Sequence, residues 1–148
     1  MAEILAFIGM FLMVVLSGSG SAIGTAMGGR ASLGAIKKNS EAFGSYLVLS
    51  ALPGTQGLYG FGSFFILMGS IKKDLTFFEG AAIFGAGLTI GVAGLVSALY
   101  QGKVCASAIK SIADGEDAFG KGMILAVFPE LYAILAFATT FLVSGIIK

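Results

Sequence analysis

The chain contains no histidine and no tryptophan, only one cysteine and two prolines, and few charged side chains. Without histidine it can neither build imidazole metal ligands nor use a histidine general base. The single cysteine, Cys105, allows neither an internal disulfide nor a metal site of several cysteines, and we assign it no role. Charged residues make up 11% of the chain and the net charge is +1, so electrostatics indicates no nucleic-acid partner.

Hydrophobic residues dominate what is present. They make up 57% of the 148 residues, and the mean hydropathy is +0.97, a composition typical of integral membrane proteins. A membrane-spanning helix needs about 20 apolar residues, and the apolar blocks are roughly 4–27, 43–71, 77–100 and 119–147. The first block is preceded by Glu3 and by no basic residue, so we predict a transmembrane helix there and not a signal peptide. The fold class we predict is an all-α integral membrane protein with four transmembrane helices.

The two halves of the chain resemble each other. At an offset of 73 residues Gly18 matches Gly91, and at an offset of 76 Pro53 matches Pro129. Runs match as well: 35–37 with 108–110 at the first offset, and 42–44 with 118–120 at the second. We therefore predict two tandem helical hairpins, and repeats of two helices keep the same orientation in the membrane. The predicted boundaries are 1–73 for the first hairpin and 74–148 for the second.

Lysine and arginine are unevenly divided between the two ends of the predicted helices. The end with both intra-hairpin loops carries six of them: Arg30, Lys37, Lys38, Lys103, Lys110 and Lys121. The other end carries three: Lys72, Lys73 and Lys148. Because cytoplasmic loops carry the excess of positive charge, we predict that the intra-hairpin loops lie in the cytoplasm and both termini outside.

Small residues recur at intervals of three and four in the first and third predicted helices, within 18–29 and 85–97. Such spacing lets helix backbones approach closely in a membrane. Two arrangements stay open at this point: these helices pack against neighbouring subunits, or they pack within one four-helix bundle. The second and fourth helices carry most of the phenylalanines, and we expect them to face lipid or to form an outer layer.

Glu130 places a carboxylate within the apolar block 119–147. A charge at the centre of a bilayer costs about 2.5–3.5 kcal/mol on insertion scales, and a carboxylate kept there usually binds or passes an ion. The alternative is a neutral, hydrogen-bonded glutamate that holds helices together. In the repeat, Glu130 aligns with Gly54, and Gln101 aligns with Gly28. The first hairpin is therefore degenerate, and the second carries the site.

Further polar groups are predicted at the depth of this carboxylate. Leu52, Thr55, Gln56 and Tyr59 follow the spacing i, i+3, i+4 and i+7, which places them on one face of the second helix. Counted from the loops, Gln56, Gln101 and the carboxylate are each roughly 13–16 residues deep, so they share a level near the middle of the membrane. The sequence thus predicts a carboxylate surrounded by neutral oxygens.

Neutral oxygens around one carboxylate suit a small monovalent cation, because −1 balances +1 and divalent ions usually need more carboxylates. A proton carrier has little use for the threonine and the two glutamines, so we predict Na⁺. The amides could instead hydrogen-bond a protonated Glu130, which keeps H⁺ as the alternative. Pro53 and Pro129 each remove a backbone hydrogen bond and free the carbonyls of Leu49 and Leu125. These prolines either serve the site or only shape the packing.

One motif surrounds the carboxylate: Phe128-Pro129-Glu130-Leu131-Tyr132. Together with the duplicated hairpin and the glycine-rich first and third helices, it resembles the four-helix proteolipid (c-type) subunit of V-type rotary ATPases over essentially the whole chain. A second run, Leu52-Pro53-Gly54-Thr55-Gln56, with Tyr59 and Gln101, resembles the Na⁺-binding bacterial branch of that family. The resemblance implies a closed ring of identical subunits that rotates in the plasma membrane of a bacterium.

The resemblance also implies the residues of the site. Its Na⁺ ligands are expected to be Glu130, Gln101, Thr55, Gln56 and the backbone carbonyl of Leu52. Tyr59 is expected to hold Glu130 by a hydrogen bond, with Pro53 and Pro129 in support.

The expected partners of such a ring are a stator membrane subunit, the central stalk of the ATPase and lipid. We predict that a stator arginine competes for the carboxylate and so releases the ion. The chain itself has no nucleotide motif and no nucleophile–base pair, so we predict a non-catalytic subunit, with ATP hydrolysed elsewhere. The rival readings are a proton-translocating rotor, a stand-alone small ion transporter or channel, and a structural membrane subunit.

Overall fold

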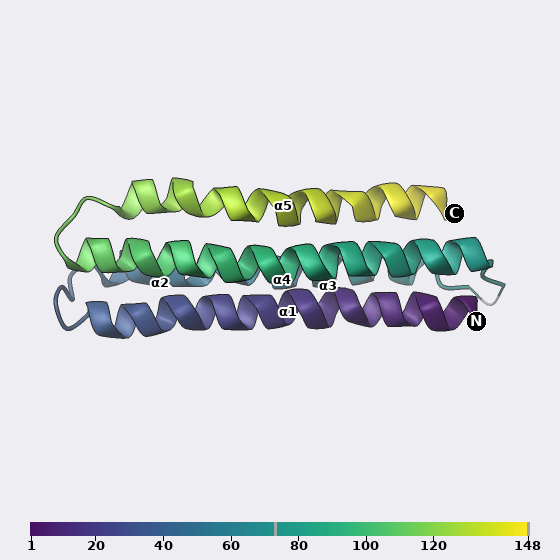
Figure 1. The fold of residues 1–148 in the computed structure, drawn as a ribbon, viewed down its shortest axis with the longest axis horizontal. Coiled ribbons are helices and arrows are strands. Elements are labelled where there is room, and N and C mark those ends of the chain that lie inside the picture. Colours follow the sequence, from purple (N-terminus) through teal and green to yellow (C-terminus); the bar gives the residue numbers. More distant parts are fainter. Residues whose placement is uncertain (73, 148) are drawn as a thin grey trace.

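A computed structural model describes residues 1–72 and 74–147, and Lys73 and Lys148, both counted in the charge comparison above, lie outside the described residues. Within the described residues every regular element is helical. The elements are α1 (Ala2–Ala35), α2 (Phe43–Ala51), the short 3₁₀ helix η1 (Leu52–Gly54), α3 (Thr55–Met68), α4 (Phe77–Ala113) and α5 (Phe119–Ile146). They form four parallel rods, with α2 and α3 together making the rod behind α1 and α4 (Figure 1). The predicted all-α class with four membrane-length segments is confirmed.

The two hairpins point the same way. Both intra-hairpin loops lie at one end of the bundle, and both labelled termini lie at the other (Figure 1). α1, α4 and α5 are each long and apolar enough to cross a membrane. Helices of 34 and 37 residues, such as α1 and α4, are about 50 and 55 Å long, whereas the hydrocarbon core of a bilayer is about 30 Å thick. The protein is therefore a multi-pass membrane protein whose helices extend beyond the hydrocarbon core.

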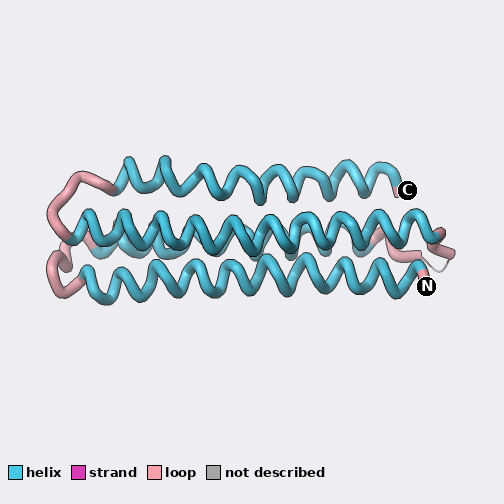
Figure 2. The backbone as a smooth tube through the Cα atoms, viewed as in Figure 1, coloured by secondary structure: helices cyan, strands magenta, loops and turns pink. Residues whose placement is uncertain are grey.

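The second rod departs from a regular α-helix at one place. α2 gives way to the 3₁₀ turn η1, which contains Pro53, before the rod continues as α3. The loops that join the rods lie at the two ends of the bundle (Figure 2). Proline has no N–H, and its ring collides with the carbonyl four residues earlier, so the chain tightens locally and the N–H of Thr55 bonds to the Leu52 carbonyl. Pro129 has no such effect, because α5 stays α-helical from Phe119 to Ile146.

Backbone contact between α1 and α4 depends on glycine. A Cβ atom added to Gly87 would lie 2.0 Å from the Gly9 carbonyl oxygen, and one added to Gly24 would lie 2.5 Å from the Ala98 carbonyl oxygen. These glycines therefore pack within the chain, the second of the two arrangements left open above. Other glycines on the same two helices have no heavy atom within 4 Å of an added Cβ: Gly18, Gly29, Gly34 and Gly85. For these, packing against a neighbouring subunit stays a prediction.

Phenylalanines cover the outside of the second and fourth rods. Four of them are more than half exposed: Phe61, Phe65, Phe128 and Phe141. An exposed apolar surface of this kind is stable against lipid or against another apolar subunit. Phe11 on α1 and Phe77 on α4 are at least as exposed, so exposure in the single chain does not distinguish the rods, and an outer layer formed by the second and fourth rods stays a prediction.

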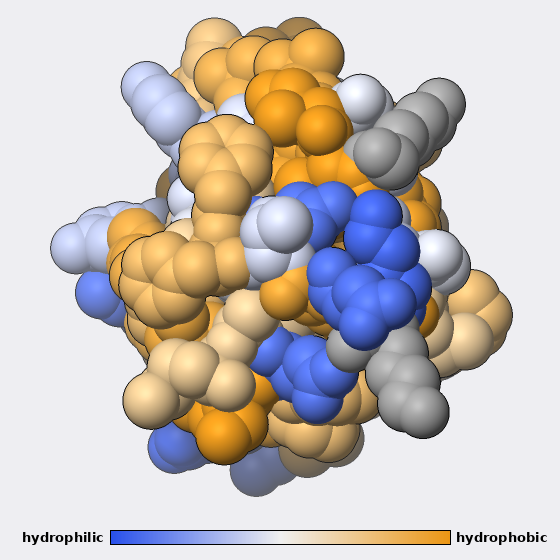
Figure 3. All heavy atoms as spheres, turned by 90° about the vertical axis from the view of Figure 1, so that its right-hand side faces the viewer, coloured by the Kyte–Doolittle hydropathy of each residue, from blue (hydrophilic) through white to orange (hydrophobic). Residues whose placement is uncertain are grey.

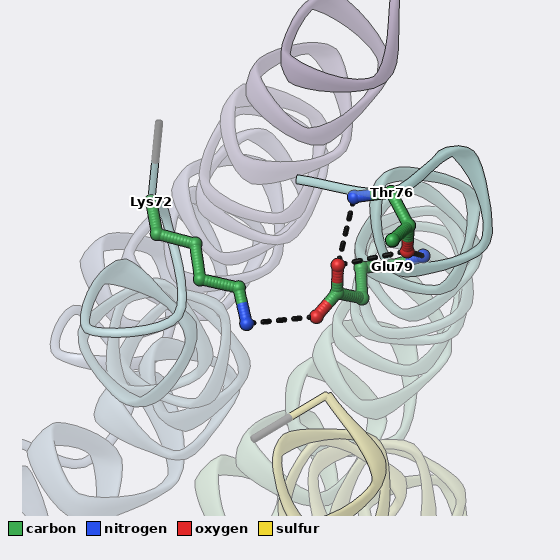
Figure 4. Close-up of polar contacts among 3 residues, drawn as sticks. All are labelled: Lys72, Thr76 and Glu79. Carbon is green, nitrogen blue, oxygen red and sulfur yellow. Dashed lines mark hydrogen bonds and ion pairs between the residues drawn. The ribbon is translucent and has the colours of Figure 1, made fainter. Parts of the chain in front are cut away.

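Polar contacts fasten the end that carries the termini. Thr76 caps α4: its hydroxyl accepts from the Glu79 N–H at 3.2 Å, and the Glu79 carboxylate accepts from the Thr76 N–H at 2.8 Å. Lys72 reaches the same carboxylate at 2.9 Å (Figure 4). Seen end on, hydrophilic groups gather near the centre of this end and hydrophobic groups surround them (Figure 3). The turn between the hairpins is thus held by a capping box and an ion pair.

An ion pair joins the two intra-hairpin loops at the opposite end. The Lys38 ammonium lies 2.5 Å from an Asp114 carboxylate oxygen. The hydrogen bond and the charge of Lys38 lower the pKa of Asp114 below its usual value. Both side chains are exposed, so this ion pair links the two hairpins at the surface and not within a buried core.

Candidate ion-binding site

Glu130 lies where α3, α4 and α5 meet. It follows Pro129 on α5 and is partly buried. One carboxylate oxygen, Oε1, accepts a hydrogen bond of 2.8 Å from the Tyr59 hydroxyl on α3. The other, Oε2, accepts one of 2.9 Å from the Gln101 amide on α4. Each carboxylate oxygen thus has a hydrogen-bond partner on a different helix.

Two buried amides continue from this carboxylate into the bundle. The Gln101 side-chain nitrogen also donates to the Ala126 carbonyl at 3.0 Å. Its oxygen accepts a 2.8 Å hydrogen bond from the Gln56 side-chain nitrogen. Both glutamines are 0% exposed, so their amides must be paired within the protein.

Thr55 completes the row on α3. Its hydroxyl lies 3.1 Å from the Leu52 carbonyl oxygen and 3.3 Å from the Gln56 side-chain oxygen. Both distances are those of hydrogen bonds, and the hydroxyl, amide and carbonyl oxygens are of the kind that a small hard cation binds.

The structure brings all five predicted Na⁺ ligands, together with Tyr59, into one connected network. Glu130 connects to Thr55 through the two glutamines, with Tyr59 on its other oxygen. Leu52 contributes its backbone carbonyl to Thr55. Among the prolines, Pro53 is buried in η1 and Pro129 directly precedes the carboxylate. Service as Na⁺ ligands stays a prediction for all of them.

Sequence reasoning missed two serines near this network, of which Ser97 contacts it directly. The Ser97 hydroxyl accepts a 3.0 Å hydrogen bond from the Gln56 amide, and the Ser21 hydroxyl accepts one of 2.8 Å from the Gly57 N–H just after η1. In the sequence both count only as small packing residues. For Ser97 one signal was present, since it lies one helical turn before Gln101 and therefore on the same face.

The buried polar side chains around the carboxylate are all hydrogen-bonded. Among the described residues, every buried side-chain nitrogen and oxygen has a hydrogen-bond partner.

A fold of two parallel membrane hairpins, with one carboxylate held among them by hydroxyl and amide groups, defines a small multi-pass membrane protein with an intramembrane acidic site. Such a site is by default one for ion binding or ion transfer.

Comparison with known proteins identifies the family. The family model for the C subunit of ATP synthase matches the chain twice, at residues 8–67 and 84–143. The V-type sodium ATPase subunit K of Enterococcus hirae is 40% identical over 94% of this chain and 89% of its own length. The A-type ATP synthase subunit K of Methanocaldococcus jannaschii is 40% identical over 86% of this chain and 58% of its own length. The chain belongs to the ATP synthase C-subunit family, and the predicted c-type identity is confirmed.

Proposed function

We propose that this chain is a rotor-ring subunit of a V- or A-type ATPase, and that its Glu130 carries Na⁺ across the membrane. The observation that supports the ion is the unbroken network from Glu130 through Gln101 and Gln56 to Thr55. One carboxylate supplies the single negative charge that a monovalent ion needs, and neutral oxygens supply the remaining contacts. The sodium ATPase relative, with 40% identity over most of the chain, points the same way.

The loaded site has to cross the lipid-facing part of the ring. With Na⁺ bound, Glu130 is part of a neutral pair, whereas an empty carboxylate would cost several kcal/mol in hydrocarbon. Rotation therefore carries each loaded subunit past the lipid to the stator. There an arginine competes for the carboxylate and releases the ion. Because one carboxylate serves two hairpins, each turn moves few ions, which suits a pump driven by ATP hydrolysis on other subunits.

The surface of the chain supports assembly with copies of itself. An open apolar groove of about 960 Å³ runs between α4 and α5, with Val92, Val96, Phe128 and Tyr132 among its lining residues. In this proposal neighbouring subunits and lipid cover such surfaces. The intra-hairpin loops, with their excess of lysine and arginine, face the cytoplasm and contact the central stalk, and the ring lies in a bacterial plasma membrane.

Carbodiimide labelling of Glu130 in the purified detergent-solubilised complex tests the ion. The reagent attacks the protonated carboxyl group, so an ion that occupies the site slows the reaction at fixed pH. We expect millimolar Na⁺ to slow labelling and K⁺ to leave it unchanged. Glu130→Gln is the control: it should remain unlabelled, assemble normally and transport no Na⁺. Labelling that responds to pH alone would contradict Na⁺ and favour the proton-translocating rotor.

A further inference from the structure

Ser97 is the one contact of the Gln56 amide that has no place in the predicted ligand set. It lies on α4, is 4% exposed, and faces a Gln56 side chain that is 0% exposed. The Gln56 side-chain nitrogen divides its hydrogen bonds between the Ser97 hydroxyl at 3.0 Å and the Gln101 oxygen at 2.8 Å. Both protons of this amide are therefore engaged on the α4 side.

Contacts with α5 set the orientation of the Gln101 amide. Gln101 donates to the Ala126 carbonyl and to the Glu130 carboxylate, and neither of these groups can donate in return. The Gln101 oxygen must therefore point toward Gln56. That oxygen accepts one proton of the Gln56 nitrogen and Ser97 accepts the other, and the two contacts together leave the oxygen of Gln56 facing Thr55 and the site.

We propose, building on the Na⁺ function above, that Ser97 is a positioning residue that keeps the Gln56 oxygen turned toward the ion. Ser97 supplies the acceptor for the second Gln56 proton. Without it, that proton is buried and unpaired unless the amide turns, and a turned amide presents a donor to a cation in place of an oxygen. Ser97 therefore sets the affinity for Na⁺ and leaves the proton chemistry of Glu130 unchanged, because it contacts Gln56 and not the carboxylate.

Ser97→Ala is the direct test, read by carbodiimide labelling of the assembled complex. A buried donor left unpaired costs enough to change an equilibrium about tenfold. We expect the Na⁺ concentration that halves the labelling rate to rise about tenfold. The labelling rate without Na⁺, followed across pH, should stay as in the wild type. This split separates a positioning role from a general loss of structure, which would change both measurements.

Two matched variants serve as controls. Ser63→Ala removes another buried serine, which bonds to Thr140 at 3.0 Å between α3 and α5, and Ser107→Ala removes an exposed serine on α4. Both should keep wild-type protection by Na⁺. Ser97→Thr, which keeps the hydroxyl, should restore protection relative to Ser97→Ala.

The possible results separate a failure of the role of Ser97 from a failure of the Na⁺ function. Wild-type protection that is unchanged in Ser97→Ala overturns the role of Ser97 and leaves the Na⁺ function standing. A Ser97→Ala complex that shifts in both Na⁺ dependence and pH profile also overturns the positioning role. A wild-type complex that Na⁺ does not protect overturns the Na⁺ function itself, and the inference about Ser97 with it.

Discussion

At the scale of single residues, the central fact is that Glu130 has a partner on each oxygen. Tyr59 on α3 and Gln101 on α4 both donate to it. Because the Tyr59 hydroxyl both donates and accepts, these contacts hold the side chain in place in either protonation state. Protection by Na⁺ against carbodiimide therefore decides between an ion site and a glutamate that only holds helices together.

Tyr59→Phe tests the donor on Oε1. The ring of Tyr59 stacks on Phe137 with centroids 5.5 Å apart, so phenylalanine should keep the packing and lose only the hydroxyl. Hydrogen bonds to charged groups contribute about 1.5–3 kcal/mol. We expect the Na⁺ concentration needed for half-protection against carbodiimide to rise about tenfold or more.

The control for this change is Tyr132→Phe, which removes the hydroxyl of an exposed tyrosine on α5. Its Na⁺ protection should equal that of the wild type. If Tyr59→Phe also binds Na⁺ as the wild type does, the hydroxyl does not hold the carboxylate in its binding conformation.

At the scale of elements, the contact of α1 with α4 depends on which glycines face inward. Gly85 and Gly87 are two residues apart on α4, yet an added Cβ meets nothing at the first and overlaps the α1 backbone at the second. The reason is the helical period, which turns neighbouring positions by about 100° and so separates a packed face from an open one.

Gly87→Ala against Gly85→Ala tests this packing. A methyl group at residue 87 forces α1 and α4 apart, and overpacking of this kind costs typically about 1–3 kcal/mol. We expect a lower thermal unfolding midpoint for Gly87→Ala in detergent. Gly85→Ala should be neutral or stabilising, since alanine favours a helix by up to about 1 kcal/mol over glycine. Equal midpoints for the two variants would contradict the glycine-dependent contact.

At the scale of the whole molecule, the exposed apolar surface is of the kind that lipid or other subunits cover. Large apolar side chains are exposed along α1, α4 and α5, and the open glycines Gly18 and Gly29 lie on α1. In a ring of copies, one side of each subunit packs against the next. The open glycines then permit close approach between subunits, as their buried counterparts do within the chain.

Gly18→Leu tests whether that surface lies between subunits. An added side chain at Gly18 meets no atom of its own chain within 4 Å, so the subunit should fold and keep its helical content. The wild type should migrate as one large complex in mild detergent, and the variant should yield a smaller or dissociated one by native mass spectrometry. Wild-type monomers or dimers would instead favour the stand-alone transporter.

The sequence by itself determined the architecture and most of the site. Four continuous apolar blocks of membrane length predict helices, because a helix pairs all of its own backbone N–H and C=O groups where hydrocarbon offers no hydrogen-bond partners. The repeat set the direction of both hairpins, and a carboxylate in an apolar block marked the site, since burying a charge is too costly to occur without use. The i, i+3, i+4 and i+7 spacing selected the polar face of the second rod.

Only the tertiary structure decided how those parts meet. Spacing along one helix carries no information about the facing helix. Ser97 could therefore not be distinguished from a packing residue until α3 was placed against α4, and the inward and outward glycines could not be separated until α1 was placed there as well. The tight turn at η1 depends on how the rod accommodates Pro53, whereas α5 passes Pro129 without a break. The Gln101 amide is oriented by two acceptors on α5, the Ala126 carbonyl and the Glu130 carboxylate. An amide side chain has no preferred direction until its partners are in place.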